Sequence, residues 1–139
     1  MTREDLIYTA ALIDGEGSVL LSHNHNAEYR SPTVSVPSTT YCFMSFLRRT
    51  FGGSVSSKHP SKKGHSESWN WSVRYNAAIE LLRRVLPYMK HPEKIRRAKL
   101  LVLHYKEVTN RGGHYTPELL RRKLKFERAF FCRSTKTHV

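Results

Sequence analysis

The sequence has few cysteines, few acidic residues and no long apolar run, and each shortage argues against a class of protein. Its two cysteines, Cys42 and Cys132, form no CxxC pair, which argues against a structural zinc site and fits a reducing compartment. No apolar stretch approaches the roughly 20 residues of a membrane-spanning helix. The charged start MTREDLIYTAALIDGEG lacks the apolar core of a signal peptide. We therefore expect one intracellular domain over residues 1–139.

Acidic residues are outnumbered by basic ones, and this imbalance is the strongest signal of the composition. There are 24 Lys and Arg residues against 11 Asp and Glu, a net charge of +13, and the pI is near 10.1. Such an excess favours a polyanionic partner, because each phosphate that is neutralised releases counterions. A solvated basic surface and an anionic membrane are the alternatives. The basic residues spread over loops and several helical segments, which favours nucleic acid over a membrane.

Hydrophobic periodicity predicts an α+β fold. In the last strand Trp69, Trp71 and Val73 alternate with Asn70 and Ser72, a period of two. All four predicted strands are amphipathic, which fits one antiparallel sheet with a helix-covered face and an open polar face suited to a DNA duplex. The predicted helices cover residues 4–14, 38–51, 76–90, 91–108 and 116–131, and the predicted strands cover 18–24, 29–36, 54–58 and 68–75.

Two carboxylates, each followed by glycine, stand where the first helix gives way to a strand, in the stretch Asp14-Gly15-Glu16-Gly17. We expect the helix to stop at Gly15, and the glycines, which allow positive φ and tight approach, to project Glu16 towards the open sheet face. An acid there would repel phosphate unless a hard cation lay between them. A plain glycine turn with two surface acids is the alternative, and the spacing alone leaves both open.

The stretch TAALIDGEG, residues 9–17, resembles the LAGLIDADG motif of homing endonucleases, with Thr9 and Ala11 as departures. Two later stretches are similar to further blocks of that family: VSVPSTTYCFMSFLRRTFGGSV and LLRRVLPYMKHPEKIRRAKLLVL. The resemblance implies an αββαββα fold with a saddle-shaped antiparallel sheet, helices on one face and additional C-terminal helices. A single motif in a short chain is typical of the members that act as homodimers.

The resemblance also implies an activity, which is site-specific, metal-dependent cleavage of double-stranded DNA at a long pseudo-palindromic site, in the service of intron homing. The two copies would join through the motif helix, with Ala10 and Ala11 packed against their symmetry mates and Asp14 a structural residue at the interface. A non-cleaving binder of the same fold, such as an intron maturase acting on RNA or a DNA-binding regulator, is the alternative. A basic structural protein, such as a ribosome-associated factor, is a third. We expect neither a membrane nor a small-molecule substrate as partner.

By the same resemblance, Glu16 is the metal ligand, with the backbone carbonyl of Gly15 as a further ligand. The ion implied is Mg²⁺ or Mn²⁺, and Ca²⁺ could occupy the site without cleavage. Lys94 is the expected catalytic lysine near the scissile phosphate, and Lys90 replaces it if the register slips. Ser38 stands where relatives carry Gln or Asn to position a water, and Cys42 where some carry Arg, so these departures leave the rate of cleavage open.

Alternation within the strands selects the residues expected to face DNA. Arg to guanine and Asn to adenine are the specific pairings, whereas the loop lysines Lys62 and Lys63 are expected to touch phosphate. The triplet at residues 23–25 spells HNH, but three adjacent residues do not make the longer metal unit of that nuclease class. The expected groove-facing set is Leu20, Ser22, Asn24, Asn26, Tyr29, Ser31, Thr33, Ser35, Ser54, Ser56, Lys58, Asn70, Ser72 and Arg74.

Overall fold

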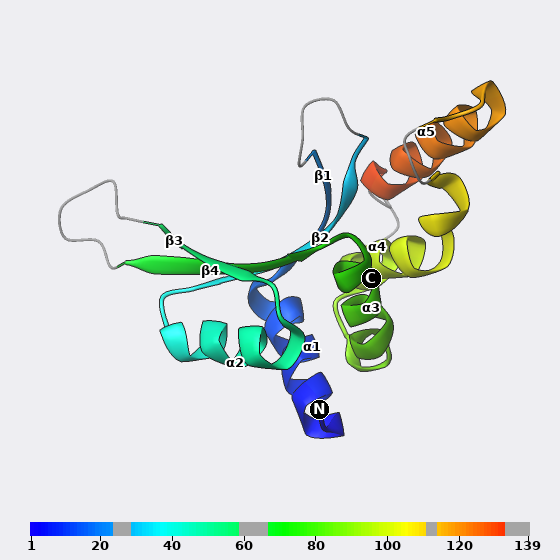
Figure 1. Cartoon of the computed structure of the whole chain (residues 1–139). Coiled ribbons are helices and arrows are strands. Elements are labelled where there is room, and N and C mark those ends of the chain that lie inside the picture. Colours follow the sequence, from blue (N-terminus) through cyan, green and yellow to red (C-terminus); the bar gives the residue numbers. More distant parts are fainter. Residues whose placement is uncertain (24–28, 59–66, 111–113, 133–139) are drawn as a thin grey trace.

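The elements of the chain follow the predicted order, as Figure 1 shows for the computed structural model. The structure describes residues 1–23, 29–58, 67–110 and 114–132. Its helices and strands are α1 (Arg3–Glu16), β1 (Ser18–Ser22), β2 (Ser31–Ser38), α2 (Tyr41–Phe51), β3 (Ser54–Lys58), β4 (Ser68–Arg74), α3 (Tyr75–Val85), η1 (Leu86–Tyr88), α4 (Pro92–His104), η2 (Lys106–Val108) and α5 (Pro117–Phe131). The predicted αββαββα fold with additional C-terminal helices is therefore confirmed.

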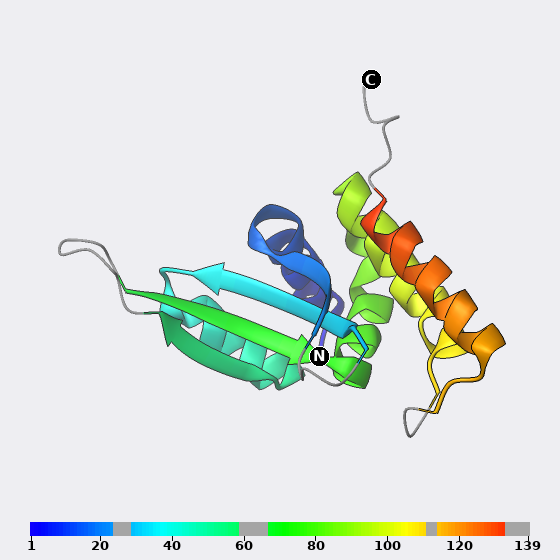
Figure 2. The ribbon, with the colours of Figure 1, turned by 90° about the horizontal axis from the view of Figure 1, so that it is seen from above.

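The four strands form one antiparallel sheet in the order β1-β2-β4-β3. The sheet is curved, and α1 and α2 lie beneath one of its faces (Figure 1). Among the described residues no helix covers the opposite face, which is open towards the top of that view. Seen from above, α4 and α5 run side by side beyond one end of the sheet (Figure 2). The molecule is thus a saddle with one covered face and one open face, as the strand alternation predicted.

Alternate residues of the strands point at the helices and form the core. Val34 in the middle of β2 and Trp71 of β4 are fully buried and share one cluster with Ile13 of α1. The Trp71 indole N–H also donates to the carbonyl of Gly52 at 2.8 Å, so the buried ring keeps a hydrogen-bond partner. No helix in the described part of the chain is both long and apolar enough to cross a bilayer.

The motif helix runs further than predicted, because it continues through Gly15 and ends at Glu16. The N–H of Gly17 bonds to the carbonyls of Ile13 and Leu12, at 3.0 and 3.1 Å, so helical bonding passes the first glycine. Of the two properties for which glycine was expected here, positive φ is not used, since Gly17 has φ −85° and Gly15 is helical. Gly17 is required instead by close packing: a Cβ there would lie 2.8 Å from the Ile13 Cα.

Candidate metal site and nucleic-acid interface

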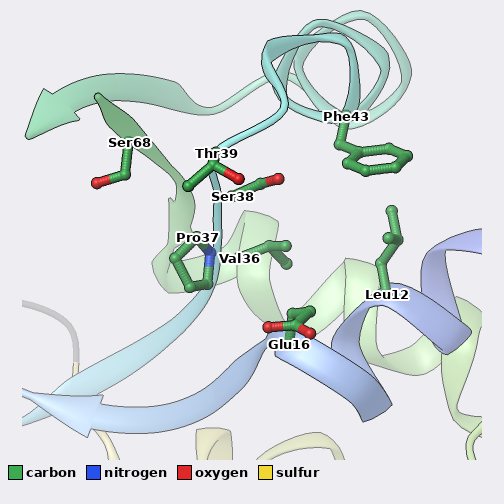
Figure 3. Close-up of a pocket in the computed structure, with 8 residues that line it drawn as sticks. All are labelled: Leu12, Glu16, Val36, Pro37, Ser38, Thr39, Phe43 and Ser68. Carbon is green, nitrogen blue, oxygen red and sulfur yellow. The ribbon is translucent and has the colours of Figure 1, made fainter. Parts of the chain in front are cut away.

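Glu16 lies at the tip of α1 and lines a hollow of about 380 Å³ (Figure 3). Within the described part of the chain, no group forms a hydrogen bond or an ion pair with its exposed carboxylate. The other residues of the hollow come from α1, β2, the turn into α2, the first turn of α2 and the start of β4, and they are Leu12, Val36, Pro37, Ser38, Thr39, Phe43 and Ser68. The fold therefore brings Glu16 and Ser38, two predicted site residues, to one cavity.

Ser38 ends β2, and its side chain helps to shape the turn into α2. Its hydroxyl oxygen accepts a hydrogen bond from the backbone N–H of Thr40 at 2.9 Å. The hydroxyl hydrogen remains able to donate to another group in the hollow, such as a water molecule. Cys42 lies in the first turn of α2 with an exposed side chain.

Lys94, in the first turn of α4, reaches the carboxyl end of α1. Its Nζ donates to the carbonyls of Ile13 and Asp14, each at 2.8 Å. In the other direction, the Asp14 carboxylate accepts from the backbone N–H groups of Lys90 at 2.7 Å and of His91 at 3.2 Å. The two helix ends therefore cap each other, which satisfies terminal groups of both helices. The Lys94 ammonium therefore lies at the tip of the motif helix, bonded to backbone carbonyls.

These bonds leave the carbonyl of Gly15, at the tip of α1, without a donor among the described residues. Gly17 and Lys94 together engage the carbonyls of Leu12, Ile13 and Asp14, whereas no described group donates to that of Gly15. The described residues hold no cluster of three or more His, Cys, Asp or Glu side chains. One copy of the chain therefore offers a carboxylate and a carbonyl oxygen, and a hard cation would need further oxygen ligands from outside it.

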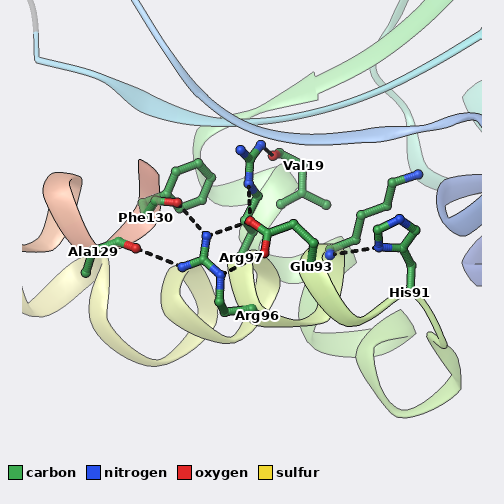
Figure 4. Close-up of polar contacts among 8 residues, drawn as sticks. Val19, His91, Glu93, Arg96, Arg97, Ala129 and Phe130 are labelled. Atoms are coloured by element: carbon green, nitrogen blue, oxygen red, sulfur yellow. Dashed lines mark hydrogen bonds and ion pairs between the residues drawn. The ribbon is translucent and has the colours of Figure 1, made fainter. Parts of the chain in front are cut away.

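An arginine-rich segment of α4 fixes this helix to two distant elements, a feature that the sequence reasoning did not identify. Arg96 donates to the carbonyls of Ala129 and Phe130, both at 2.8 Å, and Arg97 donates to that of Val19 at 3.1 Å (Figure 4). Glu93 pairs with both arginines, at 2.6 and 3.3 Å. The bonds from Arg96 hold the pKa of Glu93 below its usual value, although partial burial acts the other way. The spacing of Glu93 from Arg96 and Arg97, three and four residues, was the available signal.

The open face of the sheet carries most of the residues predicted to face DNA. Directly opposed residues on neighbouring strands share a face, and the register aligns the predicted residues of all four strands in this way. The described members of the set on that face are Leu20, Ser22, Ser31, Thr33, Ser35, Ser54, Ser56, Lys58, Asn70, Ser72 and Arg74. Asn24, Asn26, Lys62 and Lys63 lie outside the described residues.

Two members of the predicted set are on the open face but are not accessible. Ser31 and Thr33 are only 3% and 7% exposed. The Thr33 hydroxyl pairs with that of Ser22 at 2.8 Å, and the Ser31 hydroxyl donates to the Ser22 carbonyl at 3.5 Å. Because these hydroxyls are short and bonded within the sheet, the prediction that Ser31 and Thr33 present themselves to DNA is wrong.

Tyr29 precedes β2 and belongs to a cluster around a buried lysine. Lys123 of α5 is 1% exposed, and its Nζ donates to the Thr109 hydroxyl at 2.9 Å. It also lies 5.8, 4.9 and 5.3 Å from the ring centres of Tyr29, Tyr105 and Tyr115, distances at which a cation is attracted to aromatic rings. Tyr29 packs edge-on against Tyr115, so this cluster ties α5 to the segment before β2.

The prediction for the dimer surface is wrong in one residue. Ala10 is fully buried in the core of its own chain, so it cannot touch a second copy. The exposed face of α1 instead carries Ile7 and Tyr8, each 43% exposed, with Ala11 and Gly15 further along. Ala11 follows Ile7 by four residues and Tyr8 by three, and Gly15 follows Ala11 by four, so the four positions lie on one side of the helix. A Cβ on Gly15 would meet nothing within 4 Å.

Comparison with known proteins places the fold. No family model and no curated protein sequence matches the chain. The homing endonuclease I-CvuI, solved in complex with an I-CreI target, is similar with a TM-score of 0.65 and 16% identity over 99% of this chain and 89% of that one. The archaeal intron-encoded homing endonuclease I-Vdi141I, solved in complex with DNA, is similar with a TM-score of 0.67 and 18% identity, over 97% of this chain and 87% of that one.

A third solved structure is similar to this chain in the same way. The I-SmaMI LAGLIDADG homing endonuclease, bound to cleaved DNA, gives a TM-score of 0.61 and 21% identity over 94% of this chain but only 45% of that chain. The chain therefore has the fold of the LAGLIDADG homing endonucleases. The resemblance seen in TAALIDGEG and in the later stretches is confirmed at the level of the fold.

Proposed function

We propose that this protein is a site-specific, metal-dependent endonuclease that cuts double-stranded DNA at a long pseudo-palindromic site as a homodimer. The observation that carries the proposal is the exposed Glu16 carboxylate, which ends α1 beside Pro37 and Ser68 of the open sheet face. No described group pairs with it, although the chain has a net charge of +13. An unpaired acid next to a surface suited to phosphate makes chemical sense when a hard cation lies between them.

Glu16 and Gly15 fit such a cation, because a carboxylate and a carbonyl supply the oxygen ligands that Mg²⁺, Mn²⁺ and Ca²⁺ take. A bound Mg²⁺ or Mn²⁺ would supply water activation and neutralisation of the charge that develops on the phosphate. Ser38 is placed in the same hollow with a hydroxyl hydrogen free to orient a water. Lys94 holds the carbonyl end of α1 in position and adds positive charge there.

The homodimer rests on the exposed face of α1. Ile7 and Tyr8 leave a large part of their apolar surface open on α1, and exposed apolar patches mark interaction surfaces. A second copy related by a two-fold axis would cover this face and bring a second Glu16 towards the first. Since one copy offers a single carboxylate, the second would complete the set of ligands.

The proposal is tested by incubating the protein with Mg²⁺ and a library of near-palindromic duplexes, followed by sequencing of the cut ends. Paired cuts, one on each strand, are the expected product. Glu16→Gln should reduce cleavage by more than about a hundredfold, the upper end of what loss of an outer-shell partner costs a metal site. Glu118→Gln, which removes an exposed carboxylate from α5, is the matched control and should cut normally.

Binding by the same variants separates the proposal from its alternative. With Ca²⁺ in place of Mg²⁺, the native protein should retain specific duplexes without cutting them. If the native protein retains duplexes in Mg²⁺ but never cuts them, the protein is a non-cleaving binder and the endonuclease proposal is wrong. If Glu16→Gln cuts as well as the native chain, the assignment of Glu16 is wrong.

A further inference from the structure

The open face of the sheet is lined mainly by short hydroxyl side chains. One row across all four strands consists only of serines, because Ser18 opposes Ser35, Ser35 opposes Ser72, and Ser72 opposes Ser54. A serine hydroxyl is a single short group that pairs with several bases. Such a row can touch a duplex but has little power to distinguish one base pair from another.

Several of the other hydroxyls on this face are bonded within the sheet. Ser22 and Thr33 pair with each other at 2.8 Å, and the Ser31 hydroxyl donates to the Ser22 carbonyl. The Ser56 hydroxyl donates to the backbone carbonyl of Asn70 at 3.5 Å. Hydroxyls that are engaged in this way stabilise the strand register and have less capacity left for a ligand.

Asn70 and Arg74 have longer side chains than these serines and threonines, with amide and guanidinium heads that are not bonded within the sheet. Both belong to β4, which is an interior strand of the sheet, so their side chains rise from its middle rather than from its edge. Within the described part of the chain, no group bonds to the Asn70 amide or to the Arg74 guanidinium. Asn and Arg heads make paired hydrogen bonds to adenine and to guanine in the major groove, whereas Lys58, the other long polar side chain described on this face, is a point charge at the end of the edge strand β3.

We propose that Asn70 and Arg74 are the specificity-determining residues of this sheet, and that the serine row between them tolerates base changes. This inference rests on the proposed DNA-binding function. The two residues are four positions apart on one strand, about 13 Å at the usual rise, which matches three or four base pairs of duplex at about 3.4 Å each. Each half-site should therefore hold a guanine and an adenine three or four base pairs apart, with tolerant positions between.

The neighbours of Arg74 in the sheet indicate which base should adjoin the guanine that it reads. Across the sheet Arg74 opposes Thr33, and Thr33 opposes Leu20, so the three residues form one row. Leu20 is the apolar side chain of this row on the open face, and apolar groups favour contact with the methyl group of thymine. A thymine near the guanine read by Arg74 is the expected companion.

The test is selection of bound duplexes from a randomised library in Ca²⁺, for the native protein and four variants that pass a melting check. Arg74→Ala should lose a preference of about 5- to 150-fold at one position of each half-site, the range of a paired contact. Asn70→Ala should lose a similar preference three or four base pairs away. Ser72→Ala, from the serine row, and Arg48→Gln, an exposed arginine of α2 beneath the covered face, should keep the native preferences.

The outcomes separate this inference from the proposed function. If the native protein selects no sequence, the DNA-binding function fails and the inference fails with it. If the native protein is selective but Arg74→Ala weakens all sequences equally, Arg74 is a phosphate contact and the inference alone is wrong. Relaxed specificity in Ser72→Ala would also overturn it. Should Arg74→Ala fail to fold, Arg74→Gln keeps a long polar side chain whose head pairs with adenine rather than guanine, and it should still lose the guanine preference.

Discussion

Asp14 and Lys94 bond to each other's helix ends, although they are 80 residues apart in the sequence. The Lys94 ammonium donates to the Asp14 carbonyl at 2.8 Å, while the Asp14 carboxylate accepts from the two N–H groups that precede α4. The acidic tip of the motif helix is therefore held by a second helix, which is in turn fixed to β1 and α5 through Arg97 and Arg96. Placement of Glu16 depends on this chain of contacts.

Removal of the Lys94 ammonium should destabilise the fold. Lys94→Met leaves the carbonyl of Asp14 without its donor, and loss of such a partner costs about 1–3 kcal/mol of the free energy of unfolding. Urea unfolding measures this loss. Lys99→Met, an exposed lysine of the same helix, is the control and should stay within about 0.5 kcal/mol of the native chain. Equal stability of both variants would contradict a capping role for Lys94.

The exposed face of α1 should carry association of the proposed dimer. Ala11→Arg places a long charged side chain where two helices are proposed to meet, so the mass measured by sedimentation should fall from that of two copies to that of one. Ala77→Arg adds the same charge at an exposed position of α3 and should leave the mass unchanged. A native chain that sediments as one copy at every concentration and with DNA bound would contradict the dimer.

The two glycines of the motif should respond in opposite ways to alanine. Gly17→Ala places a Cβ 2.8 Å from the Ile13 Cα and 3.1 Å from the Ser35 carbonyl, and overpacking of this kind costs about 1–3 kcal/mol. Gly15→Ala meets nothing within its own chain and should stabilise the helix by up to about 1 kcal/mol. Thermal unfolding at a concentration too low for association measures both. A Gly17→Ala variant of native stability would show that the backbone of Ile13 and Ser35 yields to the added Cβ more readily than the packing indicates.

Stability should fall in acid partly through Glu93. Its pKa is held below the usual value of about 4.5 by Arg96, so its contribution is complete above that value and is lost as the pH falls through the lowered pKa. Glu93→Gln should therefore be less stable than the native chain at pH 7, by on the order of 1 kcal/mol for an ion-pair network, and this difference should shrink as the pH falls below about 4.5. Urea unfolding from pH 3 to 7 measures this, with Glu118→Gln as control. A difference that stays constant across this range would contradict the role of the ion pairs.

The strand faces were predictable because alternation has a period of two and is local. In β4, the alternation of apolar Trp71 and Val73 with polar Ser72 and Arg74 is enough to decide which side of the strand is buried. The location of Glu16 at the tip of the motif helix was also predictable, because the sequence places it between a helix and a strand. Its environment was not, because the bonds from Lys94 join segments that no local pattern connects.

The burial of some residues could not be predicted from the sequence, because their type does not indicate which way the side chain faces. Ala10 and Ala11 are adjacent and alike, and only the packed core shows that the first is buried and the second exposed. Lys123 reads as one more cation of a basic helix, yet it is enclosed by tyrosine rings from distant parts of the chain. Burial of a lysine depends on partners that meet only in the folded chain.

The strand order of the sheet bears on resistance to aggregation at high protein concentration. Its two outer strands, β1 and β3, are only five residues long each, and β3 ends in an exposed lysine, Lys58. Short rims with a charged end are poor templates for adding a further strand from another molecule. Ribbon-like growth of the sheet into fibrils is thereby disfavoured, and helix surfaces are left as the places where two molecules can meet.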